Sequence, residues 1–389
     1  MQAPVLFETL TAGNGKQLGV ATLNAEKTLN ALSMDMVALL TQQLSAWHSD
    51  PSIALVILQA SGDKAFCAGG DLQNLYLSMR EHHASDARDE PLGNAYALRF
   101  FEAEYRLDYL IHTYGKPILC WGHGIVMGGG IGLMAGASHR VVTEKSRLAM
   151  PEISVGLYPD VGGSWFLNRM PGKLGLFLAL TGASINASDA KFVKLADYQL
   201  QHAAKEQFLL SLQTQHWTDS RQGNHRLLGM ILEATEQEHA HQPAEPGPLR
   251  QHFDLLNRLC GSASLQDVAE QIGGLRSDDP WLQKAAAAFS KGCPSSAFLA
   301  HALQVRSKHL SLAEVFRLEL VASLACAAGP DFTEGIRALI MVKDMQPQWK
   351  PASLQQISEE FGQQFFASPW SEQSHPLRDL GQREQRLAA

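Results

Sequence analysis

The stretch from Lys116 to Gly163, KPILCWGHGIVMGGGIGLMAGASHRVVTEKSRLAMPEISVGLYPDVGG, decides the fold. Within it, an apolar run ends at Gly122, three glycines follow at Gly128–Gly130, and a second apolar segment begins at Ile131. This order predicts a strand, a tight glycine turn and a helix that begins at the turn. The first backbone N–H groups of such a helix are free and lie at the positive end of its dipole. The turn is therefore a candidate binding site for negative charge.

Two carboxylates follow the glycine turn in unusual company. Glu152 lies in Met-Pro-Glu, and Asp160 lies in Tyr-Pro-Asp-Val-Gly-Gly. An anion-binding turn followed by two acids predicts an acyl-transfer site. Each acid also has a simpler interpretation: Glu152 is an exposed surface acid, or Asp160 caps the helix expected to begin at Gly163.

The strand, turn and helix pattern occurs a second time. The apolar run Ile53 to Leu58 predicts a buried strand. It is followed by the sequence AFCAGGD at residues 65–71, which predicts a strand end, a small-residue turn and a helix beginning near Asp71. Two such copies indicate a repeated ββα or βα organisation. Taken alone, a Gly-Gly pair also occurs wherever a chain merely turns.

The remaining chain predicts a mixed α/β protein with a helical second half. A hairpin is expected over residues 5–23, a helix over 34–47 with Ser33 or Asp35 as its cap, and a helix over 96–112. The charge-rich residues 80–93 predict a mobile loop, a candidate lid. Beyond about residue 200 helical patterns dominate, with a linker at 240–248. We therefore expect a core domain at residues 1–200 and a mainly helical region at 201–389.

Composition excludes several classes of protein. The chain has 389 residues, 45% of them hydrophobic, with a net charge of −7 and a pI of about 6.1. Nothing here indicates a nucleic-acid partner, and no apolar run reaches membrane-spanning length. The five cysteines are scattered without a CxxC pair, which favours a reducing compartment. The first ten residues lack the pattern of a signal or transit peptide.

Three motifs carry a resemblance to a known family. The segments AFCAGGD, GIVMGGGIGL and MPEISVGLYPDVGGSWFLNR resemble the crotonase, or enoyl-CoA hydratase/isomerase, superfamily. The distal segments CPSS, EVFRLE and DFTEGIRALIMVKDMQPQWKP are similar to those of its members that hydrolyse 3-hydroxyacyl-CoA thioesters. The resemblance covers nearly the whole chain, most weakly at about 200–290. It implies an α/β fold with a crotonase-like ββα spiral core followed by a mostly helical C-terminal region.

The resemblance also implies a binding site for the acyl thioester. By this likeness the backbone N–H groups of Gly70 and Gly129 form an oxyanion hole, which stabilises the negative charge that develops on the thioester carbonyl. Ala68 matches the position whose backbone contacts the adenine end of CoA, or it is only a small residue in a turn. Glu104, in FFEAEYRLDYL, matches a substrate-pocket position, or it is a solvated helix acid.

The acids distinguish the branches of the superfamily. Members that hydrate enoyl-CoA resemble one another in having two glutamates, and here Gly132 occupies the first of those two places. Glu152 fills the second, and Asp160 is an added acid, so Glu152 and Asp160 are the expected catalytic residues. Asp160 is expected to orient the substrate's 3-hydroxyl and to move a proton. Glu152 is expected to attack the carbonyl or to activate water.

The expected activity is hydrolysis of a 3-hydroxyacyl-CoA, such as 3-hydroxyisobutyryl-CoA or 3-hydroxypropionyl-CoA, in valine breakdown. The alternatives are an enoyl-CoA isomerase or hydratase with the same oxyanion hole, and a non-catalytic acyl-CoA-binding protein. No metal or cofactor is expected, because CoA is part of the substrate. We expect a homo-oligomer without nucleic-acid or membrane partners, in the cytoplasm, or in the mitochondrial matrix if a transit peptide has been removed.

Two departures from the family pattern concern the acyl preference. Val342 stands where an acidic residue is usual, and Cys293 replaces a more usual serine. Other reactive residue types near the glycine turns have structural explanations. Cys67 lies at an apolar strand end and is expected in the core. His123 lacks a serine or second histidine at legible spacing and is expected to be structural.

Overall fold

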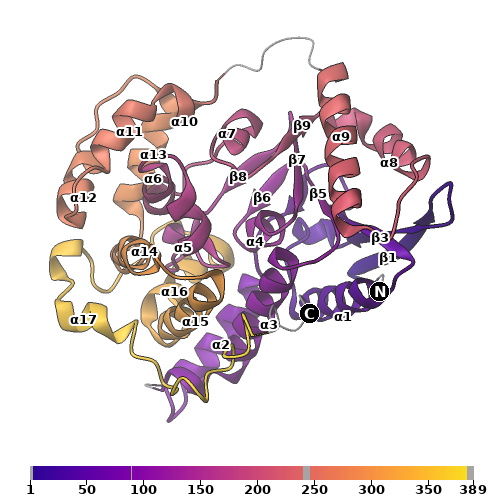
Figure 1. Cartoon of the computed structure of the whole chain (residues 1–389). Coiled ribbons are helices and arrows are strands. Elements are labelled where there is room, and N and C mark those ends of the chain that lie inside the picture. Colours follow the sequence, from indigo (N-terminus) through magenta and orange to yellow (C-terminus); the bar gives the residue numbers. More distant parts are fainter. Residues whose placement is uncertain (1–2, 89, 240–245, 383–389) are drawn as a thin grey trace. The chain divides into compact units, whose positions relative to one another are not determined.

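A computed structural model describes residues 3–88, 90–239 and 246–382, which form two compact units (Figure 1). We call Met1–Gly70, Leu107–Leu148 and Ile185–Gln251 the sheet unit. Asp71–Arg106, Ala149–Ser184 and His252–Ala389 are the helical unit. Each unit is assembled from three separate stretches of the chain. The division at residue 200 followed composition and the family likeness, and it stays a prediction.

A six-stranded sheet forms the centre of the sheet unit. Its order is β1-β2-β3-β5-β7-β9, with β1 and β2 antiparallel and the other neighbours parallel. The hairpin β1–β2 confirms the predicted one, with Val5 opposite Leu23 and Thr11 opposite Gln17. The strands are β1 (Val5–Thr11), β2 (Gln17–Leu23), β3 (Ile53–Ala60), β5 (Ile118–Gly122), β7 (His139–Thr143) and β9 (Tyr198–Leu200).

The continuous apolar run of β3 explains its place inside the sheet. Parallel strands covered on both faces need apolar side chains on both faces, and β3 lies between β2 and β5 with most of its residues buried. On one face, Val20, Leu55 and Trp121 belong to a buried cluster with side chains of two later helices, α8 (Lys205–Gln213) and α9 (Arg221–His239). Side chains alternate along a strand, so Gly19 faces the other way, where the Trp47 ring of α1 (Met34–Ser49) packs on it.

The structure confirms the helices predicted over residues 34–47 and after the Gly128–Gly130 turn, whereas η1 (Glu26–Thr28), α7 (Ala187–Phe192) and η5 (His202–Ala204) were not predicted. Helix α1 is capped by the Ser33 side chain, which accepts a hydrogen bond from the N–H of Met36. The helices are η1 (Glu26–Thr28), α1 (Met34–Ser49), α4 (Gly129–Ala135), α7 (Ala187–Phe192), η5 (His202–Ala204), α8 (Lys205–Gln213), α9 (Arg221–His239) and α10 (Pro248–Gln251).

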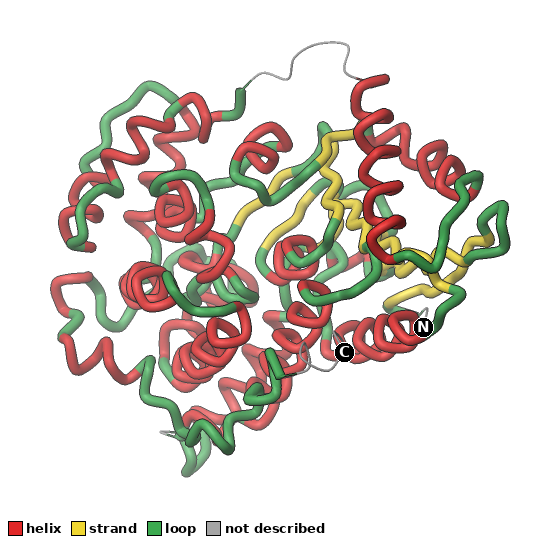
Figure 2. The backbone as a smooth tube through the Cα atoms, viewed as in Figure 1, coloured by secondary structure: helices red, strands yellow, loops and turns green. Residues whose placement is uncertain are grey.

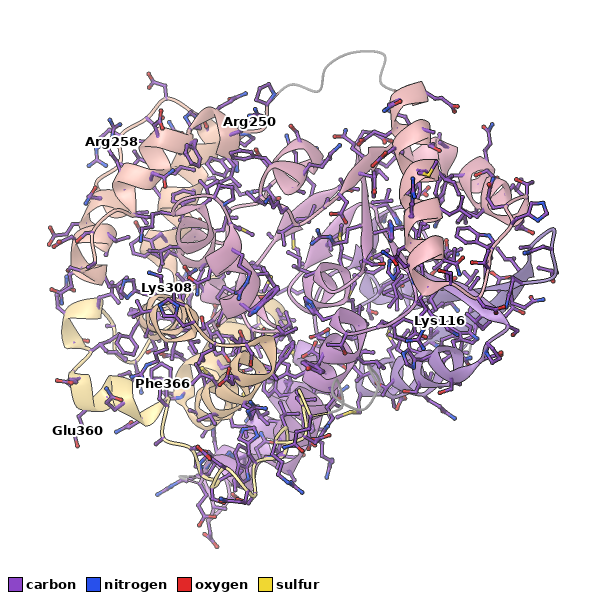
Figure 3. All side chains as sticks on the ribbon, viewed as in Figure 1. Lys116, Arg250, Arg258, Lys308, Glu360 and Phe366 are labelled. Atoms are coloured by element: carbon purple, nitrogen blue, oxygen red, sulfur yellow. The ribbon has the colours of Figure 1, made fainter. Side chains whose placement is uncertain are left out.

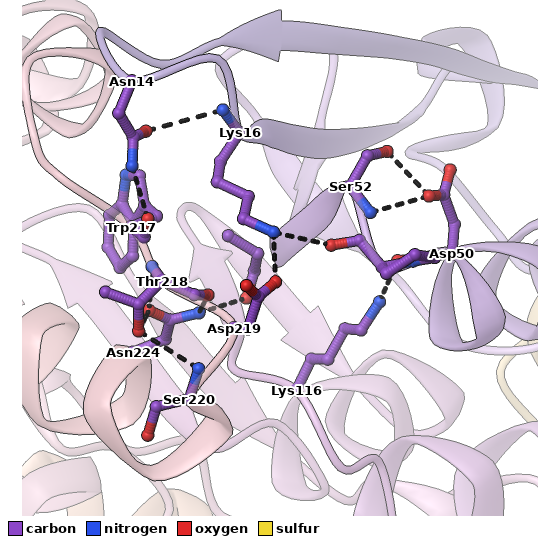
Figure 4. Close-up of polar contacts among 12 residues, drawn as sticks. Asn14, Lys16, Asp50, Ser52, Lys116, Trp217, Thr218, Asp219, Ser220 and Asn224 are labelled. Atoms are coloured by element: carbon purple, nitrogen blue, oxygen red, sulfur yellow. Dashed lines mark hydrogen bonds and ion pairs between the residues drawn. The ribbon is translucent and has the colours of Figure 1, made fainter.

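Two lysines tie loops of the sheet unit together. Lys16, beyond the hairpin turn, donates to the carbonyl oxygen of Pro51 and pairs with Asp219 (Figure 4). Lys116, labelled in Figure 3, precedes β5 and donates to the carbonyl oxygens of Trp47 and Asp50. These contacts join the end of α1 and the loop after it to the residues that precede β2 and β5.

The helical unit contains the helices that follow residue 252 and two earlier segments, Asp71–Arg106 and Ala149–Ser184. Helices are red in Figure 2. Helix α3 (Ala95–His112) contributes its residues up to Arg106. Before residue 185 lie α2 (Leu72–His83), η2 (Pro91–Gly93), η3 (Glu152–Ser154), α5 (Gly163–Phe166), η4 (Leu167–Arg169) and α6 (Leu174–Thr181). The later elements are α11 (Phe253–Leu259), α12 (Leu265–Gly273), α13 (Pro280–Lys291), α14 (Pro294–Ser307), α15 (Leu312–Ala328), α16 (Pro330–Ile336), the π-helix η6 (Arg337–Met341), η7 (Leu354–Gln356) and α17 (Glu359–Gln364).

The prediction of a loop over residues 80–93 is wrong in part. Helix α2 continues to His83, and residues 91–93 form a short 3₁₀ turn. The helix extends because His82 is buried and its Nε2 contacts the carbonyl oxygen of Ala87, while His83 contacts the carbonyl oxygen of Ala327. Most of the predicted linker 240–248 lies outside the described residues. Among the described helices, none is long and apolar enough to cross a membrane.

Candidate active site

The two glycine turns lie side by side in the sheet unit. A second, three-stranded sheet has the order β4-β6-β8, formed by Ala65–Cys67, Ile125–Met127 and Arg147–Ala149. Strands β4 and β6 are parallel, so their carboxyl ends and the turns that follow meet at one edge. The contact is close: a Cβ atom added to Gly130 would lie 2.4 Å from the carbonyl oxygen of Cys67. The two glycine turns, which are separate in sequence, are therefore packed against each other.

Backbone conformation explains why these turns need glycine. Gly69 has φ +115° and Gly128 has φ +49°, values that other residues rarely adopt. Gly129 is the first residue of α4, where the N–H has no acceptor within the helix. Over the described ranges, no backbone or side-chain group accepts a hydrogen bond from the N–H of Gly70 or Gly129. Both donors are available to an anionic group.

Ala68 is fixed in the same turn by its backbone. Its N–H donates to the carbonyl oxygen of Leu29 at 3.1 Å, so its carbonyl group is the one left for a ligand. The Asn30 side chain supports this loop by donating to the carbonyl oxygens of Ser61 and Ala65. The contact of Ala68 with the adenine end of CoA stays a prediction.

The three predicted acids lie together in the helical unit. Glu104 belongs to α3, Glu152 is the first residue of η3, and Asp160 lies in the turn before α5. They are only 2%, 7% and 5% exposed, so Glu104 and Glu152 are not solvated surface acids. Burial raises the pKa of Glu104 and Glu152 well above the usual range, and the nearby charge of Asp160 raises both further. The site therefore favours neutral acids when no ligand is bound.

Glu152 is positioned by backbone rather than by side-chain partners. It follows Pro151, and its carbonyl oxygen accepts hydrogen bonds from the N–H groups of Val155 and Leu157. Its Oε2 is buried, and no group in the described part of the chain donates to it. A buried carboxyl oxygen without a partner is rare in folded proteins and marks a candidate reactive group.

Asp160 does not cap α5, so that interpretation of the sequence is wrong. Its Oδ2 accepts a hydrogen bond from the Tyr105 hydroxyl at 2.7 Å. The first N–H groups of α5 are instead satisfied by Glu319 of α15, whose carboxylate accepts from Gly162 at 2.8 Å and Ser164 at 2.9 Å. Burial raises the pKa of Asp160 to about 6, although the Tyr105 hydroxyl opposes this rise.

The turn that carries Asp160 is strained. The next residue, Val161, has φ +51°, which a β-branched residue rarely adopts. Such strain persists only where the surrounding structure enforces it, and here the Glu319 carboxylate holds the following residues. The position of the Asp160 side chain is therefore built in by contacts distant in sequence.

Sequence reasoning missed the groups that surround Asp160. Tyr105 also contacts Ser323 at 2.7 Å, and Tyr158 contacts Ser323 at 2.8 Å and donates to the carbonyl oxygen of Glu319 at 2.7 Å. One signal was available. Ser323 interrupts the otherwise apolar run LVASLACAA, residues 320–328 of α15, and Glu319 lies directly before this run, four positions from Ser323. Polar residues on one face of an apolar helix indicate a buried hydrogen-bonding role.

Two other reactive residue types are structural, as predicted. Cys67 is fully buried at the end of β4. The Nε2 of His123 contacts the carbonyl oxygen of Gly62 at 2.7 Å, and burial lowers the pKa of His123 to about 4. Asp71 caps α2 by accepting from the N–H of Asn74 at 3.2 Å.

A family model and a curated relative both match nearly the whole chain. Residues 18–366 match the model of the family described as enoyl-CoA hydratase/isomerase. The 3-hydroxyisobutyryl-CoA hydrolase of Danio rerio, a mitochondrial protein by name, is 38% identical over 94% of this chain and 89% of its own length.

Two solved structures match nearly the whole chain. A carnitinyl-CoA dehydratase from Mycobacterium thermoresistibile has a TM-score of 0.79 and 31% identity, over 94% of this chain and 97% of that one. An enoyl-CoA hydratase from Rhodobacter sphaeroides 2.4.1 has a TM-score of 0.78 and 30% identity, over 94% and 98%. These matches confirm the predicted fold class.

Proposed function

The chain belongs to the enoyl-CoA hydratase/isomerase family, and from that premise we propose that it hydrolyses the thioester of 3-hydroxyisobutyryl-CoA to the free hydroxy acid and CoA, a step of valine breakdown. 3-Hydroxypropionyl-CoA, which lacks one methyl group, is the second expected substrate. The curated relative with this activity in its name aligns over nearly its whole length, which supports the reaction class.

The observation that carries the proposal is the set of acids. Glu152 and Asp160 are buried near each other, whereas Gly132, inside α4, supplies no carboxyl group. Addition of water across a double bond in this family is associated with two glutamates, and one is missing here. A thioester hydrolase needs one group to attack or activate water and one to move a proton, which Glu152 and Asp160 provide.

The oxyanion in this proposal is stabilised by backbone donors. Attack on a thioester carbonyl turns its oxygen into an anion, and fixed N–H groups stabilise that charge without reorganisation. Gly70 and Gly129 supply two unengaged N–H groups in adjacent turns. Neither donor titrates, so this contribution is independent of pH.

Glu152 has two possible roles in bond formation. It attacks the carbonyl carbon to form a mixed anhydride that water then hydrolyses, or it removes a proton from a water that attacks directly. Both roles need the ionised carboxylate, so the raised pKa of Glu152 makes it a strong base once it is ionised. Asp160 orients the 3-hydroxyl of the substrate and delivers a proton to the leaving thiolate.

Glu104 and Ala68 complete the proposed substrate contacts. Glu104 is assigned to the acyl pocket because it is buried beside Glu152 and Asp160. Ala68 is assigned to the adenine end of CoA through its backbone. The reaction needs only water, so we propose no cofactor or metal. A homo-oligomer, and a location in the cytoplasm or mitochondrial matrix, are part of the proposal.

A second candidate is an enoyl-CoA hydratase or isomerase. It is favoured by the two similar solved structures, which are a dehydratase and a hydratase by name. An oxyanion hole also stabilises an enolate, so the glycine turns do not separate the two chemistries. The discriminating feature is again Gly132.

Thiol release from a panel of CoA esters tests the proposal. Purified full-length protein is given S-3-hydroxyisobutyryl-CoA, 3-hydroxypropionyl-CoA, crotonyl-CoA and acetyl-CoA. Rapid release of free thiol from the two 3-hydroxyacyl esters is expected. Hydration of crotonyl-CoA without thiol release would overturn the hydrolase and support the second candidate.

An isotope experiment separates the two roles of Glu152. A single turnover in ¹⁸O-labelled water is followed by mass spectrometry of the peptide that contains Glu152. With enzyme in excess over substrate, label in Glu152 after the single turnover indicates the anhydride route, because water that attacks the Glu152 carbonyl carbon of the anhydride leaves its oxygen in the carboxylate. An unlabelled Glu152 with labelled product indicates direct attack by water.

A further inference from the structure

Four oxygen–oxygen contacts link Asp160 to the backbone of α15 through three hydroxyl groups. The Tyr105 hydroxyl lies 2.7 Å from Asp160 Oδ2 and 2.7 Å from Ser323 Oγ. The Tyr158 hydroxyl lies 2.8 Å from Ser323 Oγ and 2.7 Å from the carbonyl oxygen of Glu319. These are the distances of O–H···O hydrogen bonds. We call Tyr105, Ser323 and Tyr158 the hydroxyl chain.

The hydroxyl chain is closed to solvent. All three of its residues are fully buried. A backbone carbonyl at one end can only accept a hydrogen bond, and each hydroxyl has one proton to donate. Only the three hydroxyl protons, and a proton on Asp160 when it is protonated, are therefore available for the hydrogen bonds of the hydroxyl chain.

The proton count depends on the state of Asp160. When Asp160 is ionised, three hydroxyl protons serve four contacts, so one pair of oxygens meets without a hydrogen between them. When Asp160 carries a proton, all four contacts are satisfied in one direction. Asp160 donates to Tyr105, Tyr105 to Ser323, Ser323 to Tyr158, and Tyr158 to the carbonyl of Glu319.

An unprotonated oxygen pair is unfavourable in a buried site. Two lone pairs face each other where the low dielectric strengthens electrostatic interactions. This penalty applies only to the ionised state of Asp160. The chain therefore favours the protonated state by geometry, in addition to the effect of burial.

From this count, and resting on the proposed hydrolase function, we propose that the hydroxyl chain stabilises the protonated form of Asp160 in the substrate-free enzyme, and that this neutral form is the one that enters the reaction as an acid. Tyr105, Ser323 and Tyr158 are positioning residues, since they act through Asp160. As the C–S bond breaks, the Asp160 proton moves to the sulfur, which leaves as the CoA thiol. The water that completes hydrolysis returns one proton to Asp160, and its remaining OH completes a carboxyl group, that of the product or, in the anhydride route, that of Glu152.

The titratable groups around Asp160 respond to its charge. Glu104 of α3, Glu152 of η3, Glu319 of α15 and the phenols of Tyr105 and Tyr158 are buried, which raises the pKa of each of them, and an ionised Asp160 raises it further. Two neighbouring negative charges are unfavourable in such a buried site. Burial raises the pKa of Asp160 to about 6, which agrees with the count.

The members of the chain have opposite effects, which gives a sharp test. Without Ser323 or Tyr158, the proton of Tyr105 is free for an ionised Asp160 and no contact lacks a proton. Ser323→Ala and Tyr158→Phe are therefore expected to lower the titration midpoint of Asp160. Tyr105→Phe removes the donor to the carboxylate and is expected to raise it.

The midpoint is measured by ¹³C NMR on substrate-free, full-length enzyme labelled at the aspartate carboxyl carbons. The Asp160 signal is the one that Asp160→Asn removes. We expect Ser323→Ala and Tyr158→Phe each to lower the midpoint by about one pH unit, a tenfold change in proton affinity. The limb of the kcat/KM pH profile that requires protonated Asp160 should move by the same amount, and Ser323→Thr should restore both.

Matched controls separate this effect from a general loss of structure. Ser307→Ala removes a buried serine hydroxyl that donates to the carbonyl oxygen of Ser164, and Tyr114→Phe removes a phenol that donates to that of Leu44. Both should leave the Asp160 midpoint unchanged. If either Ser323→Ala or Tyr158→Phe fails to fold, as judged by thermal unfolding, the other decides.

An Asp160 midpoint that the folded Ser323→Ala and Tyr158→Phe variants leave unchanged, or raise, would overturn the inference. The NMR readout needs no substrate and so is independent of the proposed function. If the enzyme releases thiol but the Asp160 midpoint is the same in the variants, the hydrolase function stands and the proposed role of the hydroxyl chain is rejected. Moved midpoints in a protein that releases no thiol would keep the effect on Asp160 and reject the hydrolase.

Discussion

The sheet unit and the helical unit hold their functional groups by different physical means. In the sheet unit, the groups are backbone N–H donors of Gly70 and Gly129, fixed by parallel strands and by glycine conformations. In the helical unit, they are the side chains of Glu104, Glu152 and Asp160, fixed by burial and hydrogen bonds. Backbone N–H donors keep one charge state, whereas buried carboxyl groups gain and lose protons. The contribution of the N–H donors therefore depends on geometry alone, and that of the carboxyl groups also depends on pH.

The largest expected effect tests the helical unit. Glu152→Gln keeps the volume of the side chain but removes its ability to attack or to accept a proton. We expect kcat for thiol release to fall by about 10³-fold, the usual contribution of such a group. Unfolding temperature should not fall, because the amide carries no buried charge. The control is Glu360→Gln on α17, an exposed acid of the same unit, which should leave kcat unchanged. Full activity in Glu152→Gln would remove Glu152 from the mechanism.

The corresponding change in the sheet unit is Gly130→Ala. The new methyl group would lie 2.4 Å from the carbonyl oxygen of Cys67, so the two glycine turns must move apart. We expect kcat to fall by about 10²-fold, as when one oxyanion donor is displaced, at every pH between 6 and 9. Stability should fall by about 1–3 kcal/mol, as in other overpacked sites.

Gly273→Ala is the matched control for the glycine change. No atom lies within 4 Å of the position of the added Cβ, and φ is not positive. Replacing glycine at such a site should leave kcat unchanged and should change the free energy of unfolding by no more than about 1 kcal/mol. An active, stable Gly130→Ala variant would contradict the close contact between the turns.

A smaller effect concerns stability against pH. The folded pKa of Asp160 is raised to about 6 from its usual value near 3.8, so the folded state binds the proton more tightly. The stability from this proton is complete below the unfolded pKa and is lost as pH rises through about 6. Asp160→Asn should therefore raise the unfolding temperature at pH 7.5, by a few degrees, and much less at pH 4.5. Thermal scans at both pH values measure this. An equal rise in unfolding temperature at both pH values would show that the stabilisation does not come from the ionisation of Asp160.

The smallest effects are expected at helix starts, where the two units should behave alike. Ser33 caps α1 in the sheet unit, and Ser311 forms a capping box with Glu314 at α15 in the helical unit. Ser33→Ala and Ser311→Ala should each lower stability by about 1 kcal/mol and leave kcat unchanged. Ser49→Ala, at the end of α1, is the control and should have little effect on urea unfolding. A loss of kcat in either cap variant would link that helix start to the site.

Local sequence was sufficient to predict the glycine turns but not the surroundings of the acids. The turns follow from residue types adjacent in sequence: a buried apolar strand, glycines that alone accept positive φ, and an apolar helix. The burial of Glu152 has no such local cause. Ser323 and Glu319 lie more than 150 residues after Asp160 or Tyr158 in sequence, and only folding brings them into contact. The same applies to Asp160, whose supposed role as a cap is performed by the distant Glu319.

The interleaving of the two units has a consequence for synthesis of the chain on the ribosome. The sheet unit needs Phe208, Leu212 and Leu228 for its core, and the helical unit begins at Asp71 but continues beyond residue 252. A nascent chain of 200 residues therefore contains no finished unit, although composition changes near that position. It carries an apolar sheet face, including Leu55 and Trp121, without its covering helices. Translation must proceed well past α9 before either folding unit can close, so the nascent protein presents aggregation-prone surface to chaperones during that interval.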